Sequence, residues 1–175
     1  MKGRINMFHA RKLLKYLEEN KRIGHRNVMH NNSYYDHCMS VVLQIGYATK
    51  ADRSLLIAAC LHDIGKPYAV EYKRNYGYVF PNHVLFAVKN LCNFLDRDDP
   101  DYPEVLFLVE NQNLLKRAKN YNDDEARYKL MKIIEECNIT WIDHLIALYR
   151  AEKKCTSDIL YDNILRAERI ISSIK

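Results

Sequence analysis

The sequence predicts an all-α protein, a single helical bundle of about seven to eight helices. Apolar residues recur at helical spacing along almost the whole chain, and helix breakers are scarce, with five glycines and four prolines in 175 residues. The chain has the size of one domain, and its 48% of hydrophobic residues suffices for one core. We therefore expect residues 1–175 to form one domain.

Three helices are expected in the first part of the chain. Amphipathic spacing predicts the first near residues 6–20. Ser33 is a suitable cap for a second helix that runs to about residue 49. Asp52 is a suitable cap for a third, which should end where Gly65 and Pro67 interrupt it.

The second part begins with an irregular segment. Residues 70–80 alternate loosely around Asn75-Tyr76-Gly77, which indicates a loop or a short hairpin. Further helices should begin at residues that favour a first turn: Asn82, Tyr102-Pro103, Asp123 or Asp124, Thr140 and Ser157.

Positive charge is concentrated near the N-terminus. The net charge is +5, and residues 1–30 hold eight basic residues against two acidic ones. Such a segment could attract RNA, but it lacks interleaved aromatic residues for base stacking, so a solvated helix face is the favoured interpretation.

The chain shows no feature of a membrane or secreted protein. It lacks an apolar stretch of about 18 residues, so we expect a soluble, cytoplasmic protein without membrane contact. Its five cysteines are widely spaced and form no C-x-x-C pair, which predicts reduced thiols.

The most informative motif is His62-Asp63-Ile64-Gly65-Lys66, which follows an apolar helical run. A ligand pair at the end of a buried helix, followed by a glycine and a cation, is suited to binding a divalent ion beside a phosphate. His37 upstream and Asp143 downstream supply two more ligand types. Two imidazoles and two carboxylates suit Mn, Fe, Co, Ni, Zn or Mg.

Each of these residues also has a structural explanation. His37 could be a hydrogen-bonded core histidine, and Asp63 could form a salt bridge with Lys66. Thr140-x-x-Asp143 fits a capping box, in which the carboxylate binds backbone N–H groups. The metal site is favoured because all these alternatives would have to hold at once.

The order His37, His62-Asp63, Asp143 resembles the HD superfamily of metal-dependent phosphohydrolases, from about residue 32 to residue 152. Phe80-Pro81-Asn82-His83 is similar to an element of stand-alone HD hydrolases and of the HD domains of tRNA nucleotidyltransferases. The resemblance implies that His37, His62, Asp63 and Asp143 bind the metal, and that Lys66 and His83 face the phosphate.

One position departs from the resemblance. Family members with two metals carry a further histidine where this chain has Gln112. An amide is a poor replacement for an imidazole, so we expect one tightly held ion, with His83 as a phosphate contact or proton donor.

The expected activity is hydrolysis of a phosphomonoester or a cyclic phosphodiester of a nucleotide, by a water that the metal activates. Asp63 would orient that water, while Lys66 and His83 would stabilise the charge that develops on phosphate. Four tyrosines between residues 68 and 78 could stack on a nucleobase or could simply cover the core. The alternative function is a non-catalytic module that binds a nucleotide or RNA.

Overall fold

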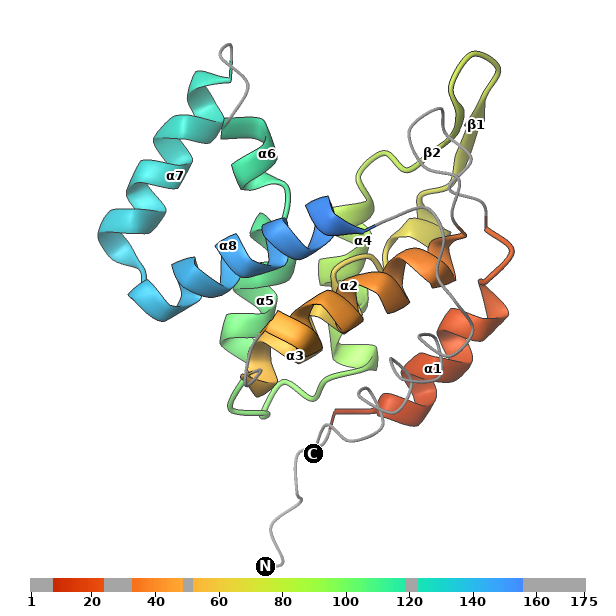
Figure 1. Ribbon diagram of the computed structural model, residues 1–175, viewed down its shortest axis with the longest axis horizontal. Coiled ribbons are helices and arrows are strands. Elements are labelled where there is room, and N and C mark those ends of the chain that lie inside the picture. Colours follow the sequence, from red (N-terminus) through yellow and green to blue (C-terminus); the bar gives the residue numbers. More distant parts are fainter. Residues whose placement is uncertain (1–7, 24–32, 49–51, 119–122, 156–175) are drawn as a thin grey trace, which may run out of the picture.

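The computed structural model describes residues 8–23, 33–48, 52–118 and 123–155, and within them the prediction of an all-α fold is confirmed (Figure 1). The α-helices are α1 (Ala10–Glu19), α2 (Tyr34–Ala48), α3 (Arg53–Leu61), α4 (His83–Asn90), α5 (Tyr102–Asn111), α6 (Leu114–Ala118), α7 (Asp124–Glu136) and α8 (Ile139–Lys154). Two 3₁₀ turns, η1 (Lys66–Tyr68) and η2 (Leu91–Asn93), and two short strands, β1 (Glu71–Lys73) and β2 (Gly77–Val79), complete the elements.

Helix α3 lies at the centre of the bundle. It is apolar all round, with seven of its nine residues buried, as expected for a helix enclosed by others. Helices α2, α5 and α8 pack against it, and α8 also contacts α2 and α5 (Figure 1). The C-terminal end of α3 and the turn after it are therefore held inside the protein.

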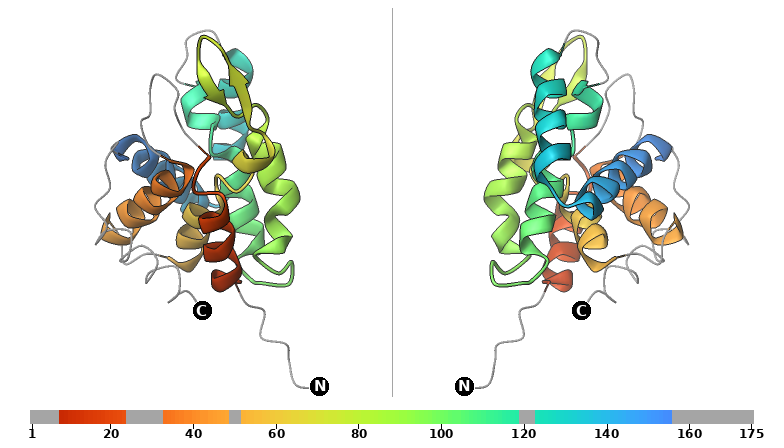
Figure 2. Two further views of the ribbon diagram at one scale, coloured as in Figure 1. Left: turned by 90° about the vertical axis from the view of Figure 1, so that its right-hand side faces the viewer. Right: turned by 90° about the vertical axis from the view of Figure 1, so that its left-hand side faces the viewer.

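Helices α6 and α7 lie at one side of this bundle and are linked to it by α8 (Figures 1 and 2). They pack on α8 through a second, smaller core formed by Leu114, Ala126, Ile133 and Ile142. Helix α6 thereby lies beside α8, which matters for the lining of the cavity described below.

Four of the predicted helix starts are confirmed. Helix α5 begins at Tyr102 with Pro103 in its first turn, and three other helices begin at the side chains predicted to cap them. The Ser33 hydroxyl accepts a hydrogen bond from the N–H of Asp36 at 3.1 Å. The Asp52 carboxylate accepts from the N–H of Ser54, and Asp123 accepts from the N–H of Ala126. These side chains satisfy N–H groups that have no partner within the helix.

Two other helix starts differ from the prediction. Asn82 precedes α4 as expected, but it adopts a left-handed conformation with φ 57° and its side chain makes no capping bond. Helix α8 starts one residue earlier than expected, because Asn138 is its cap and accepts from the N–H of Thr140 at 2.9 Å. The capping box of Thr140 with Asp143 is therefore wrong.

Residues 71–79 form the short hairpin, in which β1 pairs with β2 in antiparallel register. The four tyrosines of this region are not core residues. Tyr68, Tyr72 and Tyr76 are 50%, 69% and 64% exposed, and Tyr78 is 36% exposed. Tyr72, Tyr76 and Tyr78 do not cover the core, because the hairpin that carries them projects from the bundle (Figure 1). Tyr68 lies before the hairpin, in η1, and stacks on Tyr16 and Phe86, as the interpretation that these residues cover the core expects.

The first helix packs as its spacing predicts. Leu13 and Leu17 are fully buried, whereas Arg11, Lys12 and Lys15 are exposed on the other side of α1. These charges form a solvated helix face.

Several expectations fall partly outside the described residues. Much of the basic N-terminal segment does so, as does the helix expected from Ser157. All five cysteines are described and are free thiols. Among the described helices, none has the length and apolar character needed to cross a membrane.

Candidate metal centre

Three of the predicted ligands converge at the end of α3. His37 projects from α2, and His62 and Asp63 lie in the turn that follows α3. The Nε2 atoms of the two histidines are 3.4 Å apart. Asp63 Oδ2 lies 3.1 Å from His37 Nε2 and 3.2 Å from His62 Nε2.

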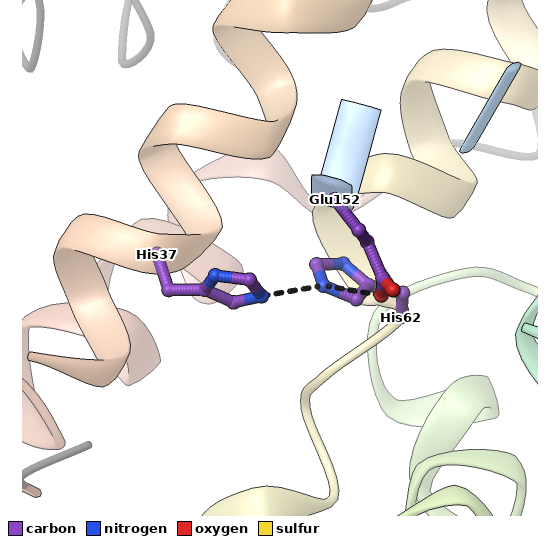
Figure 3. Close-up of side chains that lie close together, drawn as sticks. All are labelled: His37, His62 and Glu152. Carbon is purple, nitrogen blue, oxygen red and sulfur yellow. Dashed lines mark hydrogen bonds and ion pairs between the residues drawn. The ribbon is translucent and has the colours of Figure 1, made fainter. Parts of the chain in front are cut away.

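A fourth donor comes from the far end of α8. Glu152 Oε1 lies 3.6 Å from His62 Nε2, and donor atoms of His37, His62 and Glu152 all lie within 4.8 Å of one another (Figure 3). Three elements that are distant in the sequence, α2, the turn after α3, and α8, thus contribute to one cluster.

The structure does not bring Asp143 to this cluster. Asp143 is exposed in the second turn of α8, nine residues before Glu152. Nine residues advance an α-helix by about 13 Å and rotate it by about half a turn. Asp143 therefore points away from the side of α8 that carries Glu152, and the prediction that it is the fourth ligand is wrong.

The spacing of the donors fits a metal ion. Ligands at about 2.1 Å from a transition ion lie about 3.0–3.5 Å from their neighbours in octahedral or tetrahedral geometry. Four of the six separations among the donor atoms are 3.1–3.6 Å and agree with this spacing, and the donor atoms of His37 and Glu152 lie within 4.8 Å of each other. Two imidazoles and two carboxylates also form the mixed nitrogen and oxygen set that divalent transition ions accept.

Hydrogen bonding orients His62 for this purpose. Its Nδ1 lies 2.8 Å from the carbonyl oxygen of Ala59, which can only accept, so Nδ1 donates. In the neutral imidazole the lone pair is then on Nε2, the atom that faces His37 and Glu152. An outer hydrogen bond that fixes the tautomer is typical of metal-binding histidines.

The ionisation of the cluster follows from burial and close charges. Burial lowers the pKa of His37 to about 4, so this imidazole is neutral at pH 7. Burial opposes ionisation of Asp63, but His62 and Lys66 outweigh it and hold the pKa of this carboxyl well below its usual range. Burial also disfavours the charged form of His62, yet Asp63 and Glu152 raise its pKa.

Lys66 and His83 flank the cluster. The Lys66 ammonium, which is nearly buried, forms an ion pair with Asp63 Oδ2, as the alternative interpretation of this pair expects. His83 Nε2 lies 3.8 Å from the other carboxylate oxygen, Oδ1. Asp63 therefore directs one oxygen towards the histidines and the other towards His83.

An open cavity of about 330 Å³ lies beside these groups. Members of the cluster line it, including His37, Asp63 and Glu152, and so do Lys66 and His83. The remaining lining residues are Gln112, Asn113, Lys116, Tyr149, Lys153 and Cys155.

A family model described as HD domain matches residues 34–148. The chain belongs to the HD domain family. No curated protein matches the sequence significantly. HD domains form a superfamily of metal-dependent phosphohydrolases, and the match covers three of the four donors, since only Glu152 lies beyond it.

Within this HD domain, Gln112 has a structural role. It is almost fully buried, and its side-chain amide donates to the backbone carbonyl oxygen of His62 at 2.6 Å and to that of Val109 at 3.0 Å. The amide thus ties the end of α5 to the turn that carries His62 and Asp63. The expectation of a single tightly held ion stays a prediction.

Glu152 is the functional residue that sequence reasoning missed. It follows Leu145 and Leu148 at helical spacing, and both of these are buried. A carboxylate that continues the buried side of an amphipathic helix is a signal for a paired or ligating acid. Lys116 and Lys153 carried no comparable signal, because charged residues near helix ends are usually solvated.

Proposed function

We propose that this HD domain is a metal-dependent phosphohydrolase that cleaves a phosphate ester of a nucleotide or a similar small molecule. The observation that carries the proposal is the convergence of His37, His62, Asp63 and Glu152 beside a cavity that a lysine also lines. A divalent ion held by these four side chains would acidify water and neutralise phosphate charge.

Asp63 and His83 would position and deprotonate the attacking water. His83 Nδ1 donates to the carbonyl oxygen of Phe80 at 2.9 Å, and burial lowers the pKa of His83. The neutral imidazole therefore presents a lone pair on Nε2, close to Asp63 Oδ1. In this proposal Asp63 Oδ1 orients the water and His83 Nε2 accepts its proton.

The proton balance closes through solvent. The attacking and leaving oxygens lie on opposite sides of phosphorus, so the leaving oxygen would take its proton from a water in the open cavity, while the His83 imidazolium, whose pKa is lowered by burial, would release its proton to solvent. In this proposal His83 is a proton acceptor, in place of the proton donor expected from the sequence. Lys66 would supply a point charge to the phosphoryl oxygens after turning from Asp63.

The test is a metal analysis of the purified protein, followed by hydrolysis assays with Mn²⁺, Co²⁺, Ni²⁺, Zn²⁺ and Mg²⁺. Substrates would include p-nitrophenyl phosphate, bis-p-nitrophenyl phosphate, and linear and cyclic nucleotides. We expect metal-dependent release of product that EDTA abolishes. Bound metal without hydrolysis of any of these esters would instead support the non-catalytic module.

A further inference from the structure

The cavity beside the metal centre contains more positive charge than one phosphate requires. Three lysines line it, from three elements: Lys66 in η1, Lys116 in α6 and Lys153 in α8. Asp63 and Glu152 are the carboxylates among the lining residues. We count the imidazoles as neutral. Three ammonium groups and one divalent ion, together with two carboxylates, then give the site with its metal ion a net charge of +3.

Two of the three lysines are available to a ligand. Lys66 pairs with Asp63. In the part of the chain that the structure describes, neither Lys116 nor Lys153 forms an ion pair with a carboxylate, and the Lys153 ammonium lies 5.7 Å from the ring centroid of Tyr149. Both side chains are exposed at the rim, so they can reach a bound molecule without a large desolvation cost.

A single phosphate group at the metal centre engages the ion and Lys66 and leaves the charge of +2 on Lys116 and Lys153 unmatched. A phosphomonoester carries a charge of about −2 near neutral pH, and a cyclic phosphodiester carries about −1. Either would leave the rim lysines without an anionic partner. We propose that the substrate is a phosphomonoester with a second phosphate group, which Lys116 and Lys153 bind while the first phosphate is hydrolysed.

This inference rests on the proposed function and narrows its substrate class. Water adds to the first phosphorus, the ester bond from that phosphorus to the substrate oxygen breaks, and the freed oxygen takes a proton. The products are inorganic phosphate and an alcohol that still carries the second phosphate. Cyclic phosphodiesters are thereby disfavoured.

The lining of the cavity suits recognition by charge more than by stacking. A volume of about 330 Å³ lies at the small end of the usual range for ligand sites. Apart from the imidazoles of His37 and His83, Tyr149 is the one aromatic side chain among the residues that line it, and the Lys153 ammonium lies over its ring. We therefore expect little discrimination among nucleobases.

Binding to EDTA-treated protein tests the inference without any hydrolysis, because EDTA removes the ion but leaves Lys116 and Lys153, the groups proposed to bind the second phosphate. The probes are adenosine 5′-monophosphate, adenosine 3′,5′-bisphosphate and 3′,5′-cyclic AMP, measured by calorimetry. We expect the bisphosphate to bind about tenfold more tightly than the monophosphate, which corresponds to about 1.4 kcal/mol. Lys116→Ala and Lys153→Ala should each weaken bisphosphate binding by about fivefold, with a smaller effect on the monophosphate.

A basic residue next to each of the two lysines serves as a control, because its substitution by alanine removes the same charge. Arg117 is next to Lys116 but pairs with Asp123 at 3.1 Å, and Lys154 is next to Lys153 but does not line the cavity. Arg117→Ala and Lys154→Ala should leave the affinities for all probes unchanged. Circular dichroism melts would verify that the four variants are folded.

The outcomes separate the inference from the proposed function. Equal wild-type affinities for the monophosphate and the bisphosphate would overturn the inference, as would tightest binding of cyclic AMP or equal losses for both ligands in the lysine variants. Hydrolysis of p-nitrophenyl phosphate with any of these results would leave the proposed function intact. Absence of hydrolysis with lysine-dependent bisphosphate binding would refute the hydrolase and support the second phosphate site.

Discussion

Glu152 Oε1 lies 3.6 Å from His62 Nε2, although 90 positions separate the two residues in the chain. This contact joins the end of α8 to the turn after α3. It also selects one of two acidic residues on α8 as the candidate ligand, since Asp143 is exposed on the opposite side of that helix.

The two acids of α8 should therefore differ in their effect on metal binding. Glu152→Gln should weaken binding of a divalent ion by at least about tenfold, because it removes a ligand charge from the cluster. Asp143→Asn, the matched control on the same helix, should bind metal as the wild type does. Mass spectrometric metal analysis and competitive chelator titration measure both. Loss of metal binding in Asp143→Asn, with normal binding in Glu152→Gln, would show instead that Asp143 is the fourth ligand, as the sequence predicts.

Asp63 and Lys66 should have separable roles. Asp63→Asn should lose both metal and activity, because it removes a ligand and the oxygen that orients water. Lys66→Ala should keep the metal, since it removes a positive charge beside the ligands, but should lose about 100-fold in kcat/KM. Equal metal loss in the two variants would contradict this division.

Metal affinity should depend on pH through His62. The carboxylates of Asp63 and Glu152 raise the pKa of His62, so this imidazole must lose a proton before Nε2 can bind an ion. The dissociation constant for the metal ion should accordingly increase by up to about tenfold for each pH unit below that raised pKa. The pKa of His37, about 4, keeps that residue neutral over the same range. Calorimetric titrations with the metal ion at pH 6, 7 and 8, each in two buffers, would measure the change in affinity and the proton released on binding. A metal affinity that does not depend on pH would contradict this role of His62.

Gly65 should be intolerant of any side chain. A Cβ atom there would lie 1.9 Å from the carbonyl oxygen of His83 and 2.4 Å from the amide nitrogen of Ala87, so α4 would have to move. We expect Gly65→Ala to lower the free energy of unfolding by about 3 kcal/mol and to displace His83 from the site. Gly46→Ala, inside α2, should be neutral or stabilising by up to about 1 kcal/mol. Thermal and urea denaturation compare the two.

An ion pair outside the site, between the partly exposed Arg53 and the buried Asp99, should contribute to stability. Arg53 Nη1 and Nη2 each donate to one carboxylate oxygen of Asp99 at 2.8 Å, and the Asp99 side chain is fully buried. We expect Asp99→Asn to cost about 2 kcal/mol of unfolding free energy, because it leaves the guanidinium without its main partner. Glu110→Gln, at an exposed position of α5, should cost nothing measurable.

The same pair should give a pH dependence. Burial opposes ionisation of Asp99, but the hydrogen bonds from Arg53 and from the N–H of Asp101 outweigh it and lower its pKa. The stabilisation is therefore fully present above the ordinary pKa of a carboxyl group and is lost as the pH falls through the lowered value. Urea titrations between pH 2.5 and pH 7 should show a difference between wild type and Asp99→Asn that shrinks towards low pH. A constant difference would contradict the assignment.

The helical class, most helix starts and the pair at the centre of the candidate site were predictable from the amino-acid sequence. Helical spacing and caps such as Ser33, Asp52 and Asp123 act locally, so a single sequence suffices to place them. The pair His62-Asp63 was predictable for a similar reason, because an ionisable pair next to an apolar helix needs a partner in any fold.

The acid that completes the cluster could be identified only from the packing of the helices. The choice between Asp143 and Glu152 depends on the side of α8 that faces α2 and α3, and this depends on where Asn138 begins the helix and how the helix packs. The exposure of the hairpin tyrosines and the approach of Lys116 to the cavity were decided in the same way. Contacts between distant segments are set by packing and chain direction, and neither can be read from local residue patterns.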